Sequence, residues 1–145
     1  MSAIERDFVS HPRLFRFLGP ASASEVAEVL DELGVQGSVP EDLVRFWMNH
    51  GGGDLFETES ILAPVSRGIA DDDLRETNQF YWDRGMPRSY LLFHIGVILS
   101  AIDLRNARVA VLDANTFSEI QSYSTLDEWY VGTLRKEYAN RYRLD

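Results

Sequence analysis

Valine and leucine residues between positions 26 and 33 recur at i, i+3, i+4 and i+7, the spacing that places apolar side chains on one face of an α-helix. Ser22 and Glu25 precede this face with the spacing of a capping box, in which both side chains accept hydrogen bonds from free backbone amides. Gly34 follows and can adopt the left-handed conformation that ends a helix. The pattern therefore predicts a helix between Ser22 and Gly34.

A second helix is predicted to begin at Pro40, because proline's missing amide hydrogen has no helical partner at a first position. Its apolar face consists of Leu43, Phe46 and Trp47. The Asn-His-Gly-Gly-Gly run at residues 49–53 is interpreted as the end of this helix followed by a tight turn.

Apolar segments between turn residues predict β-strands in the rest of the chain. The apolar run at residues 90–104 contains His94, Ser100 and Asp103, and is interpreted as two buried strands rather than a membrane span. The predicted strands cover residues 55–58, 61–65, 90–95, 97–104, 108–113 and 119–123.

Two further helices are predicted, over residues 71–82 and from Thr125 onward. The order of helices, strands and a final helix indicates an α+β fold with N-terminal helices, a central, mostly antiparallel twisted sheet of about four to six strands, and a C-terminal helix. With 45% apolar residues, the 145-residue chain is expected to form a single domain over residues 1–145. Residues 1–21, which end at Gly19-Pro20, are expected to form an extended or partly helical arm packed on it.

Composition argues against several classes of function. The chain has no cysteine, which excludes disulfides, thiolate nucleophiles and cysteine-based metal sites. A formal net charge of −9 disfavours binding to nucleic acid, whose phosphates attract Lys and Arg. Glu5, Arg6 and Asp7 interrupt any apolar signal segment, and no run is long enough to span a membrane. We therefore expect a cytoplasmic protein that does not contact membranes.

The negative charge is concentrated in one part of the chain. Residues 21–83 contain 14 acidic and three basic residues, whereas residues 1–20 and 84–145 each have a net charge of +1. Such asymmetry predicts a negative face that could steer a basic partner toward it. The alternative is a solvated surface that only keeps the protein soluble.

Candidate catalytic and metal-binding residues form no recognised constellation. Glycines 51–53 lack the following Lys-Ser/Thr pair of a phosphate-binding loop. His11, His50 and His94 are too far apart for a zinc-binding motif, and His94 is expected to be a hydrogen-bonded core residue. The aspartates at 71–73 lack the alternating ligand spacing of a calcium loop and are interpreted as helix-start residues. No catalytic residue, metal or cofactor is therefore predicted.

Three consecutive aromatic residues, Phe80, Tyr81 and Trp82, cannot all face one side of a helix. At least one is expected at the surface or in a groove beside Asp83, and exposed aromatic residues are common binding anchors. The alternative is that a helix and the following loop bury all three.

Residues 22–138 resemble a domain of the SUKH superfamily, the SMI/KNR-type immunity proteins. The family pattern is an acidic amphipathic helix, a proline-started helix with aromatic residues, Asn followed by glycines, an apolar central strand with a hairpin partner, and a closing helix. The residues that carry this resemblance are Glu25–Gly34, Val39–Trp47, Asn49–Asp54, Tyr90–Gly96, Val109–Asp113 and Ser124–Leu134.

The resemblance implies a non-enzymatic domain that binds another protein and needs no cofactor. Bacterial members resemble immunity proteins that neutralise secreted polymorphic toxins, often nucleases, by direct binding. Fungal members resemble scaffolds for cell-wall and signalling proteins, so a module that binds a host protein is the alternative. A basic toxin domain would suit the acidic segment, whereas the sequence does not define an oligomeric state. The candidate partner contacts are Asp54, Glu57, Glu59, Trp82 and Asp83.

Overall fold

The structure is a computed structural model that describes residues 1–65 and 73–144. The helical elements in the described residues are α1 (Ala3–Ser10), the 3-10 turn η1 (Pro12–Leu14), α2 (Ala23–Glu32), α3 (Glu41–His50), α4 (Leu74–Asp83), α5 (Leu126–Tyr130), the π-helical turn η3 (Val131–Arg135) and α6 (Lys136–Tyr142). Its strands are β1 (Phe15–Phe17), β2 (Gly53–Leu55), β3 (Glu59–Ile61), β4 (Tyr90–Ile95), β5 (Leu99–Asp103), β6 (Arg108–Leu112) and β7 (Glu119–Tyr123). Among these described helices, none has the length and hydropathy required to cross a membrane.

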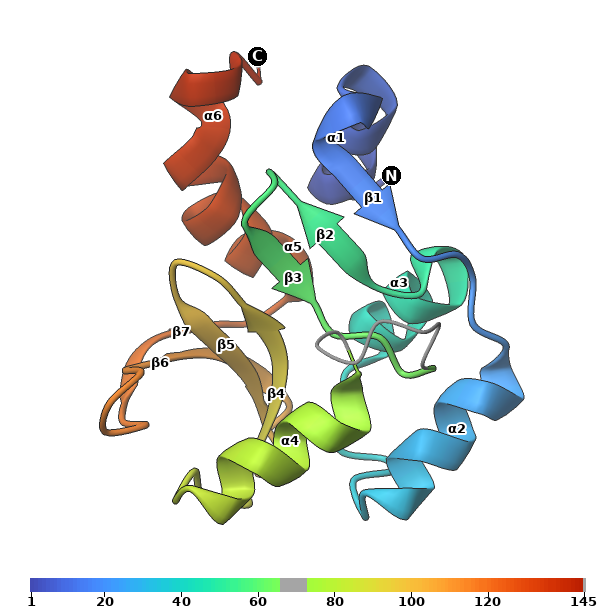
Figure 1. Ribbon diagram of the computed structural model, residues 1–145, viewed down its shortest axis with the longest axis vertical. Helices are drawn as coiled ribbons and strands as arrows, with labels where there is room; N and C mark the ends of the chain where they lie inside the picture. Colours follow the sequence, from blue (N-terminus) through green and yellow to red (C-terminus); the bar gives the residue numbers. More distant parts are fainter. Residues whose placement is uncertain (66–72, 145) are drawn as a thin grey trace.

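The seven strands form one antiparallel sheet whose spatial order follows the chain from β1 to β7 (Figure 1). The predicted α+β fold with a C-terminal helix is therefore confirmed, although the sheet has more strands than the four to six expected. The additional strand, β1, belongs to the N-terminal arm and pairs Phe15 with Leu55. A three-residue strand contains too little alternation of apolar and polar residues to be recognised from sequence.

The strands β2 and β3 begin two residues earlier than the predicted strands 55–58 and 61–65. The turn between them contains Phe56 and Glu57, which have φ values of 51° and 70°. Non-glycine residues rarely adopt positive φ, so neither residue marks this turn in the sequence. Glu59 is therefore the first residue of β3, and its side chain is buried.

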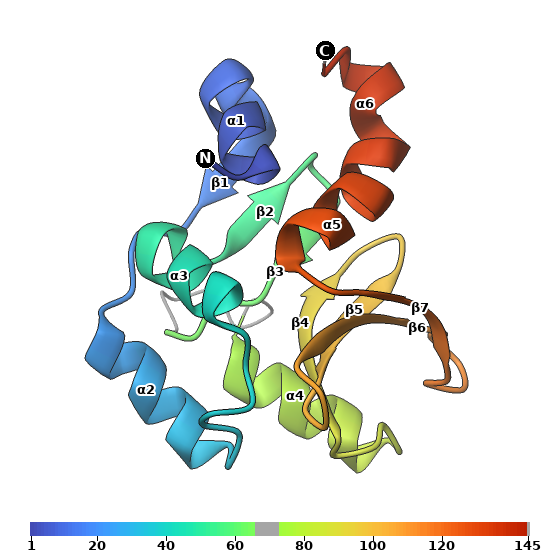
Figure 2. The same cartoon turned by 180° about the vertical axis from the view of Figure 1, so that it is seen from behind.

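The strands β4, β5 and β6 are buried along almost their whole length, because both faces of this part of the sheet are covered. The helix α4 packs against β4, and α5 packs against β7 and α1. Figures 1 and 2 both show α1 and α6 at one end of the molecule and α2 and α4 at the other. The acidic helix α2 therefore lies away from both chain termini.

Side-chain caps define several helix starts as the sequence predicts. Ser22 and Glu25 form the expected capping box at the start of α2. Asp73 caps α4 by accepting a hydrogen bond from the Glu76 amide at 2.9 Å. Asp71 and Asp72, predicted to lie in the same helix start, are outside the described residues.

A buried carboxylate joins the N-terminal arm to the C-terminal helices. Asp7 of α1 accepts hydrogen bonds from the Tyr130 hydroxyl at 2.6 Å and from Arg135 Nε at 2.9 Å. Burial and the neighbouring Asp7 carboxylate raise the pKa of Tyr130, which keeps its phenol protonated as a donor. This contact links α1 with α5 and η3, which lie at opposite ends of the sequence.

Gly51 is expected to tolerate substitution less well than Gly34. Both have left-handed backbone conformations, with φ of 79° and 72°, so alanine at either should cost about 1 kcal/mol in conformational strain. At Gly51 the added Cβ would also overlap the Gly19 carbonyl oxygen, whereas Gly34 faces open space. Urea unfolding should show Gly51→Ala to be less stable than Gly34→Ala by about 2 kcal/mol. Equal losses would show that the Gly19 segment moves aside freely.

Candidate functional site

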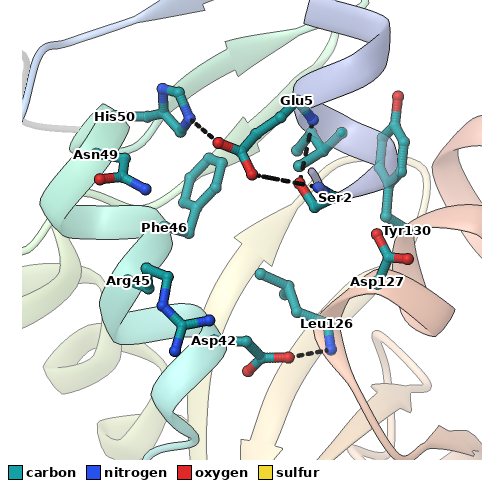
Figure 3. Close-up of a pocket in the computed structure, with 11 residues that line it drawn as sticks. Ser2, Glu5, Asp42, Arg45, Phe46, Asn49, His50, Leu126, Asp127 and Tyr130 are labelled. Atoms are coloured by element: carbon teal, nitrogen blue, oxygen red, sulfur yellow. Dashed lines mark hydrogen bonds and ion pairs between the residues drawn. The ribbon is translucent and has the colours of Figure 1, made fainter.

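A cavity of about 90 Å³ lies where α1, α3 and α5 converge (Figure 3). Ile4, Phe46, Leu126 and the Tyr130 side chain supply apolar walls. The remaining lining residues are polar or charged: Ser2, Glu5, Asp42, Arg45, Asn49, His50 and Asp127. Binding sites combine apolar walls with convergent polar groups, and this cavity has both, which makes it the candidate site.

Two carboxylates in the cavity wall are each fixed by a backbone amide from another helix. Asp42 of α3 accepts a hydrogen bond through Oδ2 from the Leu126 amide at 2.8 Å. Asp127 of α5 accepts one through Oδ1 from the Ala3 amide at 2.7 Å. Each aspartate thus occupies the first turn of its own helix and also supplies a partner for a free amide at the start of a second helix. These two bonds hold the three helices together around the cavity.

The third carboxylate, Glu5, closes the capping box of α1. Its Oε1 accepts a hydrogen bond from the Ser2 hydroxyl at 2.9 Å, and its Oε2 lies 3.6 Å from His50 Nε2. The Ser2 hydrogen bond lowers the pKa of Glu5 despite the opposing effect of partial burial, and the His50 ring contributes to the lowering. Glu5 is therefore held as a carboxylate at one side of the cavity.

Two polar atoms in this wall are buried without a hydrogen-bond partner among the described residues, Asp42 Oδ1 and His50 Nε2. The His50 ring is held by Phe8, Phe17 and Phe46, with ring centroids 4.8 to 5.8 Å away. Buried polar atoms in folded proteins nearly always have a partner. His50 Nε2 lies near one, Glu5 Oε2 at 3.6 Å, so Asp42 Oδ1 is the atom of this wall that lacks one among the described residues.

A second polar cluster lies inside the core and joins β3, β4, β5 and α5. His94 Nε2 lies 2.8 Å from Glu59 Oε1, and His94 Nδ1 lies 2.9 Å from Ser100 Oγ. This order of serine, histidine and carboxylate is that of a hydrolase triad. However, Glu59, His94 and Ser100 are all 0% exposed, so a substrate cannot reach Ser100 Oγ in this conformation. The cluster is a structural hydrogen-bond network.

Proton positions in this network follow from its donors. Trp129 Nε1 donates to Ser100 Oγ at 2.9 Å, so the Ser100 hydroxyl is directed toward His94 Nδ1. A neutral His94 then carries its proton on Nε2 and donates it to Glu59. Burial lowers the pKa of His94 and outweighs the opposing effect of Glu59, so the ring remains neutral.

Glu59 is ionised although it is buried. Burial alone would raise its pKa, but hydrogen bonds from His94, from Tyr138 at 2.6 Å and from the Val97 amide at 3.2 Å outweigh that effect and lower it. Gly96 is required beside this carboxylate, because a Cβ there would overlap Glu59. The buried charge is therefore balanced by donors from β4, the β4–β5 turn and α6.

The predicted partner contacts Asp54 and Glu57 do not form a purely acidic surface. They line a groove of about 300 Å³ together with Arg13 and Arg16, and Arg16 lies opposite Asp54 in the β1–β2 register. Asp54 also accepts a hydrogen bond from Ser60 Oγ at 2.9 Å. Two arginines of the arm thus balance the two acidic residues, a neighbourhood that the sequence does not reveal.

The other predicted contacts are dispersed. Glu59 is in the core, and Trp82 is only 9% exposed, with its indole nitrogen donating to the Tyr90 carbonyl at 2.9 Å. Neither presents a surface for a partner in this structure. Asp83 is exposed at the end of α4, and the aromatic residue that reaches the surface is Phe80, which is 48% exposed. The five candidates therefore do not form one site.

The cavity was not predicted from the sequence, because the contacts that form it join segments far apart in the chain. Asp42 and Asp127 each lie in the first turn of a helix, where an acidic residue is expected merely to favour the positive end of the helix dipole. Their contacts with the starts of other helices span 84 and 124 residues of sequence. Within residues 1–65 and 73–144, no group of three His, Asp or Glu side chains is arranged to hold a metal ion.

Comparisons with known proteins find a similar fold but no matching family model or curated protein. A protein from Pseudomonas syringae pv. tomato of known crystal structure is similar, with a TM-score of 0.70 over 89% of this chain and 96% of that chain. The two sequences are 12% identical, so the similarity shows a shared fold and leaves the function of this chain to its own residues.

Proposed function

We propose that the protein is a non-enzymatic, cytoplasmic protein-binding domain that acts as an immunity protein and neutralises a basic toxin, such as a nuclease, by direct binding. The observation that carries the proposal is the acidic surface of α2. Glu28 and Asp31 are exposed, and neither takes part in an ion pair within the described chain. The resemblance of residues 22–138 to SUKH immunity proteins supports the same function.

Arg45 and Arg75, the basic residues of the acidic segment that the structure describes, are not paired with Glu28 or Asp31. Arg75 is already paired with Glu32 at 2.8 Å, and Arg45 is paired with Glu41 at 3.1 Å. Within residues 1–65 and 73–144, no ion pair compensates the charge of Glu28 and Asp31, and the chain as a whole has a net charge of −9. Such a field accelerates the approach of a basic protein more than it strengthens the final complex.

Charge reversal on α2 should slow toxin binding. We expect Glu28→Lys with Asp31→Lys to lower the association rate constant by about tenfold at low salt, and to weaken its dependence on salt. The partner is the C-terminal domain of a toxin encoded beside this chain, and the measurement is stopped-flow or surface plasmon resonance.

The matched control is Glu57→Lys with Asp83→Lys, which changes the net charge by the same amount on other surfaces. If this control lowers the association rate constant less than the α2 variant does, the steering surface lies on α2. If both variants lower it equally, net charge alone accounts for the steering. An unchanged association rate in both variants would contradict electrostatic steering. Failure to bind any neighbouring toxin domain, together with a stable host-protein complex, would favour the alternative of an intracellular scaffold.

A further inference from the structure

We propose that the N-terminal helix α1 controls the rotation of the C-terminal helix α6. Docked α1 holds η3 as a π-helical turn, and displacement of α1 lets η3 become α-helical and turns α6 away from the core. The result is a conformational coupling between two hydrogen-bond networks that share no residue, that of Asp7 and that of Glu59. It goes beyond the proposed function and does not depend on the identity of the partner.

Asp7 joins α1 to the last residue of α5 and the last residue of η3. Its carboxylate is buried and accepts hydrogen bonds from the Tyr130 hydroxyl at 2.6 Å and from Arg135 Nε at 2.9 Å. On an α-helix, residues with the spacing of Tyr130 and Arg135 are separated by about 140° around the axis. The i→i+5 hydrogen bonds of a π-helical turn bring such residues closer to the same side. The contact of both residues with one carboxylate therefore favours the π-helical turn.

The π-helical turn also sets the direction in which α6 faces. It contains one residue more than an α-helical turn, so every later residue is turned by about 100° from its place in an uninterrupted α-helix. With this rotation the Tyr138 hydroxyl donates to Glu59 Oε2 at 2.6 Å, and the Tyr138 ring stacks on Phe56 with ring centroids 4.8 Å apart. An α-helical η3 would turn Tyr138 away from both. The Asp7 contact and the Glu59 contact are therefore coupled through η3.

The helix α1 is held by few apolar contacts, which suits an element that can detach. Among its residues only Ala3, Ile4 and Asp7 are buried, and Phe8 is partly buried. Figures 1 and 2 show α1 at the periphery, at the same end of the molecule as α6. Elements with little buried apolar surface open at a lower free energy than the core. Displacement of α1 would then release Asp7 while the sheet stays intact.

The first test is a double-mutant cycle between Asp7 and Tyr138, which share no hydrogen bond or ring contact. Tyr138→Phe removes the hydroxyl that donates to Glu59, and should raise the unfolding equilibrium constant about tenfold in the otherwise wild-type protein. With Asp7→Asn present, α6 has already turned away, so the same substitution should raise it less than about twofold. Urea unfolding of the four proteins measures both effects, and the dispersion of their amide NMR spectra reports whether each is folded.

Ser22→Ala provides the control background for this cycle. It removes the capping side chain of α2 and so lowers stability at the other end of the molecule, without a change to α1 or α6. In this background Tyr138→Phe should again raise the unfolding constant about tenfold. A tenfold effect with Asp7→Asn as well would overturn the coupling. A less than twofold effect with Ser22→Ala would also overturn it, because general loss of stability would then explain the result.

The second test deletes Val131, a residue of η3 that is 47% exposed. The deletion removes the extra residue of the turn, so α5 and α6 become one uninterrupted α-helix with α6 facing as before. Tyr130 and Arg135 then have the i, i+4 spacing of neighbours on one helix face, and both still reach Asp7. Tyr138→Phe should raise the unfolding constant about tenfold in this protein whether or not Asp7→Asn is present.

Deletion of Glu28 is the matched control, because Glu28 is exposed in α2, which has no π-helical turn. It turns the buried Val29 and Leu30 by about 100° from the core, and should raise the unfolding constant about a hundredfold more than deletion of Val131. Equal losses from the two deletions would overturn the interpretation of η3 as a turn with one extra residue. Coupling between Asp7 and Tyr138 that survives deletion of Val131 would overturn η3 as its route.

Discussion

Replacing Glu59 with glutamine is expected to destabilise the protein by about 3 kcal/mol or more. The wild-type carboxylate accepts hydrogen bonds from His94, Tyr138 and the Val97 amide inside the core. A neutral amide accepts through only one oxygen, and its NH2 group would face a donor, so at least one buried donor loses its partner. Urea unfolding at neutral pH, with the midpoint and slope compared between variants, measures the loss.

Glu57→Gln is the control for this experiment. Glu57 precedes Glu59 by two residues and is exposed in the β2–β3 turn, so its substitution should change the free energy of unfolding by less than about 0.5 kcal/mol. A loss below about 1 kcal/mol for Glu59→Gln would show that the network relaxes around the amide. The two glutamates look equivalent in the sequence, and the structure predicts opposite outcomes for them.

The second large effect is a loss of stability in mild acid. The pKa of His94 is lowered from its ordinary value of 6.5 in the folded protein, so below that pH the unfolded chain binds a proton that the folded chain excludes. The contribution of His94 is complete above pH 6.5 and is lost as the pH falls toward the folded pKa. The free energy of unfolding should fall by up to about 1.4 kcal/mol per pH unit for this one proton.

Glu59 extends the effect to lower pH. Its pKa is lowered from 4.5 on folding, so its stabilising contribution is present above pH 4.5 and is lost as the pH falls through the folded pKa. Urea unfolding between pH 8 and pH 4 should therefore show a decline that begins near pH 6.5 and steepens below pH 4.5.

His94→Gln tests whether His94 causes the loss of stability that begins near pH 6.5. It removes the titrating ring, so the variant should be less stable than wild type at pH 8 but should lose less additional stability between pH 6.5 and pH 5. The difference in slope between the two proteins is the decisive quantity, since it does not depend on how much the substitution destabilises the core. Parallel pH profiles would contradict the assignment to His94.

Local patterns in the sequence were informative where the relevant contacts are local. The capping box of Ser22 and Glu25 and the apolar face that follows it predict α2 correctly, because those interactions connect residues three or four positions apart. The strand positions near residue 60 are less predictable. Two non-glycine residues with positive φ form the turn there, which the sequence does not mark. Glu59 is buried because it accepts hydrogen bonds from His94 and Tyr138, which are distant in the sequence.

The sequence by itself determines the α+β class, the absence of cysteine chemistry and the concentration of negative charge in residues 21–83, because composition and short-range periodicity define them. Only the tertiary structure determines which acidic residues are buried, which lie beside basic residues and which are exposed to a partner. It buries Glu59, places Asp54 and Glu57 beside two arginines, leaves Glu28 and Asp31 exposed, and brings Asp42 and Asp127 to one cavity. These outcomes depend on strand register and on contacts between segments as many as 124 residues apart, which no local pattern records.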